Sequence, residues 1–226
     1  MIKLENKKNK LKKETNLFGA QTIGEEIANS ITHGLGAVLS TAALVILVVL
    51  ASKRGDAWRI VSFSIYGATL ILLYLSSTLY HSFVNPKVKN FLRILDHLAI
   101  YLLIAGSYTP ITLVSMRGAW GWTLFGLIWG MAIAGITISI AFKEKLKPVM
   151  VLSYVVMGLL IVVAFKPMLL ILPQKMIFCL FIGGVFYLLG IIFYLWKRLP
   201  YHHPIWHLFV LGGSISHFFG ILFYLT

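Results

Sequence analysis

The sequence predicts an all-α, polytopic membrane protein, built as a seven-transmembrane helix bundle. Hydrophobic residues make up 59% of the 226 residues, and the mean hydropathy of +0.87 is too high for an ordinary soluble domain. The apolar residues gather in seven runs, and a membrane helix needs about 20 mostly apolar residues. Because backbone groups in lipid must be hydrogen-bonded internally, and the runs are too long for barrel strands, each run is predicted as a helix.

The first four apolar runs are long, and basic residues separate them. They cover residues 31–51, 60–81, 94–114 and 121–142. Ahead of the first run, the segment from Thr22 to Glu25 has the pattern of a capping box, in which two side chains satisfy the exposed N–H groups of a helix start. The first helix is therefore predicted to begin near Thr22 and to include the polar residues before position 31.

The last three runs cover residues 149–165, 176–196 and 206–225. The fifth run is predicted as the shortest span, because Lys166 and Pro167 end it before a further apolar patch. Pro204 falls in the first turn of the final helix, where its missing N–H costs nothing. The connections are short, so sequential helices are predicted to be antiparallel, and residues 19–226 to form one transmembrane domain.

Lysine and arginine predict how the bundle lies in the membrane. With the amino terminus inside, the cytoplasmic segments hold fourteen of these residues and the outer segments six, which favours the amino terminus in and the carboxyl terminus out. Residues 1–18 then form a basic cytoplasmic tail whose expected partner is anionic lipid headgroups. The net charge of +13 does not indicate nucleic-acid binding, because the basic residues lie between apolar runs. The chain is predicted as a multi-pass protein of the cell (plasma) membrane.

The histidines gather at one face of this topology. Six of the seven histidines lie at span ends that share this face: His33, His81, His97, His202, His203 and His207. Asp96 opens the third span at the same face. His203 and His207 are four residues apart, so both imidazoles project from one side of a helix. Ionisable groups at membrane depth are costly and mark functional sites, so a site is predicted at this face.

Three of these histidines are predicted as zinc ligands: His81, His203 and His207. Three protein ligands and an open position for water are what catalytic zinc prefers. Asp96 is predicted to hold the water or to act as general base, and Ser77, one turn before His81, to stabilise the oxyanion or hold the water. A second interpretation stays open, in which the histidines simply face the headgroups; His97 and His202 are interpreted in that way.

A polar stripe on the first helix faces the same site. Glu26, Asn29 and His33 stand at i, i+3 and i+7, and they are predicted to surround and orient the ligands. For His33, the roles of ligand, substrate contact and packing all stay open. His217 lies deeper and is interpreted as a buried histidine bonded to a serine or a carbonyl group. Trp206, at a span end, is interpreted as part of an aromatic belt.

The motifs, in chain order, are Glu26-x-x-Asn29-x-x-x-His33, Ser77-x-x-x-His81, Asp96 and His203-x-x-x-His207. This set resembles the hemolysin III family, the bacterial branch of the progestin and adipoQ receptor family, and the similarity runs from about residue 20 to residue 226. The resemblance implies a seven-helix bundle with its amino terminus inside. It also implies zinc near the cytoplasmic face, held by His81, His203 and His207, and a water held by Asp96.

Three functions follow as expectations. The first is a zinc-dependent hydrolase of lipid amides or esters acting on a membrane lipid; related receptors and the alkaline ceramidases of the wider superfamily are thought to hydrolyse lipid amides. The second is a pore-forming haemolysin or channel that causes cytolysis, as the family name implies. The third is a membrane receptor or regulator in which the metal is only a structural staple. The hydrolase is favoured because a carboxylate and a serine accompany the three histidines.

Overall fold

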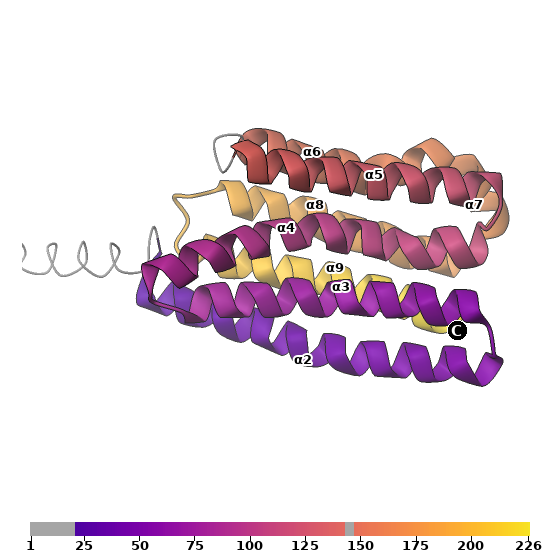
Figure 1. Ribbon diagram of the computed structural model, residues 1–226, viewed down its shortest axis with the longest axis horizontal. Helices are drawn as coiled ribbons and strands as arrows, with labels where there is room; N and C mark the ends of the chain where they lie inside the picture. Colours follow the sequence, from indigo (N-terminus) through magenta and orange to yellow (C-terminus); the bar gives the residue numbers. More distant parts are fainter. Residues whose placement is uncertain (1–20, 143–146) are drawn as a thin grey trace, which may run out of the picture.

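The computed structural model describes residues 21–142 and 147–226, so the predicted tail over residues 1–18 lies outside the described residues. The elements in these ranges are all helical. They are α2 (Ile23–Arg54), α3 (Ala57–Ser82), α4 (Pro86–Pro110) with a π-helical extension η1 (Ile111–Ser115), α5 (Ala119–Phe142), α6 (Lys147–Leu159), the 3-10 segment η3 (Leu160–Ala164), α7 (Phe165–Ile171), α8 (Gln174–Leu195) and α9 (His202–Leu225). They make seven spans long and apolar enough to cross a membrane. The chain is an all-α, multi-pass membrane protein, and the predicted seven-helix bundle is confirmed (Figure 1).

Sequential spans run in opposite directions, and the last helix returns to the first (Figure 1). α2 packs against α3, α3 against α4, and α8 against α9, while α9 also contacts α2 and α4. The start of α2 and the carboxyl terminus lie at opposite ends of the bundle (Figure 1). One end, called the histidine end below, therefore collects the starts of α2, α4 and α9 and the last turn of α3. Which side of the membrane this end faces stays a prediction.

α2 begins where the capping box predicts. Thr22 is the N-cap: its hydroxyl accepts from the Glu25 N–H (3.3 Å), and the Glu25 carboxylate accepts from the Thr22 N–H (2.8 Å). The buried face of the first turns is polar, whereas Ile27 and Ile31 are exposed. The buried polar residues are Glu26, Asn29 and His33. Lipid solvates apolar side chains, so the polar side chains turn inward, toward the site.

The fifth span is longer than predicted. α6 continues through η3 and α7, so the expected end at residue 165 is wrong. Pro167 lies in the first turn of α7, where a missing N–H is tolerated. Tyr108 of α4 contacts the segment where the helix type changes: its hydroxyl donates to the Gly158 carbonyl (2.9 Å) and accepts from the Ile161 N–H (3.0 Å). These bonds hold α6 and η3 beside α4.

Gly36 permits the close approach of α2 and α3. A Cβ built at this position would overlap the ring of Tyr74, which is fully buried and held by a hydrogen bond from its hydroxyl to Ser214 (2.7 Å). We therefore expect Gly36→Ala to lower the free energy of unfolding by about 1–3 kcal/mol through overpacking. Thermal unfolding of the purified protein in detergent measures this loss.

Gly126→Ala is the matched control for that substitution. Apart from the adjoining residues and backbone of its own helix, no atom of the described chain lies within 4 Å of a Cβ built on Gly126, which is exposed on α5. Alanine there removes a glycine from a helix interior and should be neutral or stabilising, by up to about 1 kcal/mol. Equal melting temperatures for the two variants would contradict the assigned contact.

Candidate metal centre

The histidine end brings together three histidines from two helices. His81 lies in the last turn of α3, and His203 and His207 lie in the first two turns of α9. Their potential ligand atoms all fall within 4.8 Å of one another. Zinc–nitrogen bonds are about 2 Å long, so small side-chain rotations suffice for one ion to contact all three rings. The structure thus places the three residues predicted as ligands at a single point.

Hydrogen bonds decide which nitrogen two of these rings present. His81 Nδ1 lies 2.5 Å from Glu26 Oε2, and because a carboxylate oxygen accepts, Nδ1 carries the hydrogen. His207 Nδ1 lies 3.2 Å from the Thr32 hydroxyl, which itself donates to the backbone carbonyl of Ala28 (2.8 Å). The Thr32 oxygen therefore accepts from His207. In both histidines Nε2 is left with a lone pair.

The three Nε2 atoms share a second property. Those of His81, His203 and His207 are buried, and none has a hydrogen-bond partner in the part of the chain that the structure describes. Buried polar atoms are nearly always paired, so three unpaired nitrogens at one point indicate a common ligand. Neutral imidazole suits zinc, copper, iron and nickel. The residues present therefore fit a transition-metal ion.

Asp96 and Ser77 lie beside the cluster rather than within it. Both side chains are buried, Asp96 on α4 and Ser77 on α3, one turn before His81. The Ser77 hydroxyl lies near the Asp96 carboxyl group, but its buried oxygen has no hydrogen-bond partner among the described residues. A carboxylate next to the cluster suits the predicted role of holding a water or taking its proton. Their assignment to catalysis stays a prediction.

The polar stripe of α2 contacts the cluster. Glu26 accepts the hydrogen bond from His81, and the amide nitrogen of Asn29 lies 3.3 Å from the same ring nitrogen. The His33 ring stacks on His207, with centroids 3.5 Å apart and an interplanar angle of 13°. Both ring nitrogens of His33 are buried and without a hydrogen-bond partner among the described residues. Because Nδ1 of His81 already donates to Glu26, the Asn29 amide nitrogen cannot donate to it. Glu26 is therefore the residue that holds His81, Asn29 lies beside the same ring, and His33 lies against a predicted ligand.

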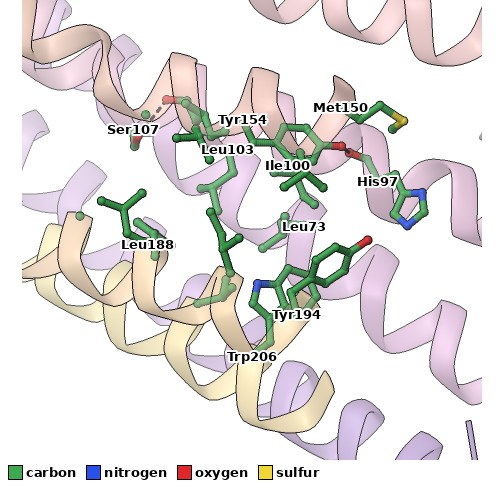
Figure 2. A pocket seen from close by; sticks show the side chains of 18 of the residues that line it. Leu73, His97, Ile100, Leu103, Ser107, Met150, Tyr154, Leu188, Tyr194 and Trp206 are labelled. Carbon is green, nitrogen blue, oxygen red and sulfur yellow. Dashed lines mark hydrogen bonds between the residues drawn. The ribbon is translucent and has the colours of Figure 1, made fainter. Parts of the chain in front are cut away.

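A cavity of about 190 Å³ extends from the cluster between α4, α6, α8 and α9. Its end nearest the cluster is bordered by His33, Asp96, His97 and His203. Figure 2 shows Tyr194 and Trp206 on one side and Tyr154 on the other, with Ile100 and Leu103 between them. Most of the lining is aliphatic or aromatic. The shape suits a ligand with an apolar chain and a polar end at the cluster.

Comparison with known proteins settles the family. A family model described as "Haemolysin-III related" matches residues 21–218. The chain belongs to the hemolysin III family. It is 52% identical over 204 residues to "Hemolysin-3" of Bacillus cereus, covering 90% of this chain and 93% of the relative. The "Hemolysin-3 homolog" of Bacillus subtilis (strain 168) is 50% identical over 203 residues, with coverage of 90% and 95%. The human "Monocyte to macrophage differentiation factor" is 31% identical over 216 residues, with coverage of 90% and 86%.

The resemblance drawn from the motifs is thus confirmed, and the structure gives further residues around the cluster a place. Trp206, expected in an aromatic belt, instead packs against the His203 ring (4.8 Å) and lines the cavity. His97, expected to face the headgroups, also borders the cavity. The carbonyl contact interpreted for His217 is confirmed, since its Nε2 lies 3.2 Å from the Leu180 carbonyl oxygen, although the residue is half-buried rather than buried. No local pattern marks the cavity residues, because six different helices contribute to its lining.

Proposed function

We propose that this member of the hemolysin III family is a zinc-dependent intramembrane hydrolase of lipid amides or esters. The observation that carries the proposal is the set of buried, unpaired Nε2 atoms of His81, His203 and His207, whose ligand atoms lie within 4.8 Å of one another. Three protein ligands leave a fourth position open, as in catalytic zinc sites, whereas structural zinc sites usually take four protein ligands. The donor set therefore favours catalysis over a purely structural role.

The residues around the cluster have defined tasks in this reaction. Zinc at such a site makes water a usable nucleophile at neutral pH. Asp96 holds the water and takes its proton as general base, and the Ser77 hydroxyl supports Asp96 or the carbonyl oxygen of the substrate. The apolar cavity takes the acyl chain and leaves its carbonyl group at the polar end. Hydrolysis adds the hydroxyl group to the acyl carbon and delivers a proton to the departing amine or alcohol.

We place this site at the cytoplasmic leaflet. The distribution of lysine and arginine favours the amino terminus inside, and α2 begins at the histidine end. The basic tail over residues 1–18 then lies beside anionic headgroups of the same leaflet. A lipid of the inner leaflet is accordingly the expected substrate.

Lipid turnover by the purified full-length protein tests the proposal. The protein is reconstituted in vesicles that contain both lipid amides and lipid esters, and released fatty acid is measured by mass spectrometry. We expect release that stops when a chelator removes the metal and returns when zinc is added. Undiminished turnover by metal-free protein would contradict the proposal. Stoichiometric zinc with no turnover of any lipid, and a lower melting temperature after chelation, would favour a metal-stapled receptor or regulator.

A pore-forming haemolysin is the second candidate, and the names of the two Bacillus relatives favour it. A pore needs a continuous aqueous path, which does not depend on a metal. Dye leakage from vesicles separates the two candidates. Leakage that persists in a variant lacking all three cluster histidines would favour the pore, and the absence of leakage beside measurable fatty-acid release would favour the hydrolase.

A further inference from the structure

Lys89 is a lysine buried at the histidine end, with only 8% of its surface exposed. Its ammonium group lies 2.9 Å from Glu26 Oε1, donates to the Tyr80 carbonyl (3.1 Å) and sits 4.9 Å from the centre of the Tyr80 ring. Lys87, two residues earlier, is exposed. Lysine is almost never buried unless it is paired. The contact with Glu26 is therefore part of how this end of the bundle is built.

The start of α4 fixes the direction of this side chain. Asn85 is the N-cap, and its side-chain oxygen accepts from the Lys87 N–H (3.0 Å). Pro86 occupies the first helical position, where its restricted φ favours a helix start. The Lys89 N–H then donates to the Asn85 carbonyl (2.8 Å). A capped and rigid first turn directs Lys89 back against the last turn of α3.

The two carboxylate oxygens of Glu26 contact different partners, the Lys89 ammonium group and the His81 ring. Oε1 pairs with Lys89, and Oε2 accepts from Nδ1 of His81. Glu26 is itself buried (3% exposed), and a buried charge is stable only when it is paired and hydrogen-bonded. The ion pair holds the carboxylate in one orientation. In that orientation Oε2 accepts from the His81 N–H, which leaves the buried Nε2 as the nitrogen that His81 can offer to a metal ion beside the other two histidines.

We propose that Lys89 is a positioning residue of the metal centre and acts through Glu26 on His81. The proposal rests on the proposed function, because it requires the three histidines to hold a metal ion. A carboxylate that accepts from the second nitrogen of a ligating histidine fixes the ring orientation, and loss of such a contact costs about 10–100-fold in metal affinity. Lys89 extends this line of contacts by one residue, from α4 through α2 to α3.

The competing explanation is that the ion pair only fastens α4 to α2. An ion pair with only this structural role affects the stability of the metal-free protein and leaves the metal affinity unchanged. A positioning residue changes the metal affinity, and it does so only while Glu26 retains its carboxylate. The two explanations therefore predict different zinc affinities, which can be measured without knowing the substrate.

The experiment measures zinc affinity of the full-length protein in detergent, by competition with a chromogenic chelator. The variants are Lys89→Met, Glu26→Gln, the double variant, and the exposed control Lys87→Met. We expect Lys89→Met to bind zinc about 10–100-fold more weakly, and Lys87→Met to match the wild type. In the Glu26→Gln background, Lys89→Met should cause little further loss. The melting temperatures of the metal-free proteins are recorded alongside.

Each outcome decides the proposal. If Lys89→Met keeps the wild-type zinc affinity but melts at a lower temperature, the ion pair has only a structural role and the proposal is overturned. An equal loss from Lys89→Met with and without the Glu26→Gln substitution would also overturn it, since the effect would not pass through the carboxylate. If Lys89→Met does not purify as a folded protein, Lys89→Gln, which keeps a donor without the charge, is judged by the same criteria. Wild-type protein that binds no zinc would instead refute the proposed function, and tight zinc binding without lipid turnover would refute only the hydrolase.

Discussion

Replacing His81 by alanine is expected to lower the zinc affinity of the purified protein by roughly 10²–10³-fold. Structural zinc sites bind with about 10–16 kcal/mol from four ligands, so one ligand contributes on the order of 3–4 kcal/mol. His81 is the only member of the cluster that α3 supplies, whereas His203 and His207 both come from α9. Its loss therefore leaves two ligands on a single helix. Metal content by elemental analysis, and affinity by chelator competition, measure the change.

His202→Ala is the matched control for this prediction. His202 adjoins His203 on α9, is half-buried, and has its Nδ1 3.2 Å from the Phe193 carbonyl oxygen. It does not belong to the three-histidine group, so its variant should retain zinc at the wild-type level. The Glu26–Lys89 pair does not involve the His81 side chain directly, which favours a folded His81→Ala protein. Full zinc content in His81→Ala would remove the basis of the metal site.

The sequence predicts the histidine end well because its position follows from residue spacing within single helices and from the alternating direction of the spans. The capping box at Thr22 places the start of α2, and the four-residue spacing of His203 and His207 places both rings on one side of α9. The alternation of seven spans then assigns the end of α3 and the start of α9 to the same face. Together these steps bring His81 to the side of the bundle where the other two lie. The distance of 4.8 Å is a property of the packing, which only the structure supplies.

The cavity and the role of Lys89 could not be predicted in the same way. Both depend on contacts between helices that are not neighbours in the chain. In the sequence, Lys89 is one of several lysines near a span end, and it counts only toward the orientation of the protein. Its burial follows from the rigid start of α4 and from a carboxylate on α2. Likewise, the fifth span continues past Lys166 because Tyr108, on another helix, supports the 3-10 segment.

Asp96→Asn is expected to retain zinc while lipid turnover falls by about 10²–10⁴-fold, the usual contribution of a general base. Asparagine keeps the shape of the side chain but cannot take a proton from water. Asp96 is not a member of the three-histidine group, so the metal affinity should change far less than in His81→Ala. Fatty-acid release and zinc content are measured on the same preparation, because only the combination of retained metal and lost turnover identifies this role.

Asp56→Asn provides the comparison at the opposite end of the bundle. Asp56 is the N-cap of α3 and accepts from the Trp58 N–H (2.9 Å), and asparagine caps a helix about as well as aspartate. Its ion pair with Arg59 is partly exposed and contributes little to stability, so this variant should keep both zinc and turnover. If Asp96→Asn loses zinc as well as turnover, Asp96 holds the metal itself. If turnover persists in Asp96→Asn, the proton goes elsewhere, and the cluster lacks the base that a hydrolase of this design requires.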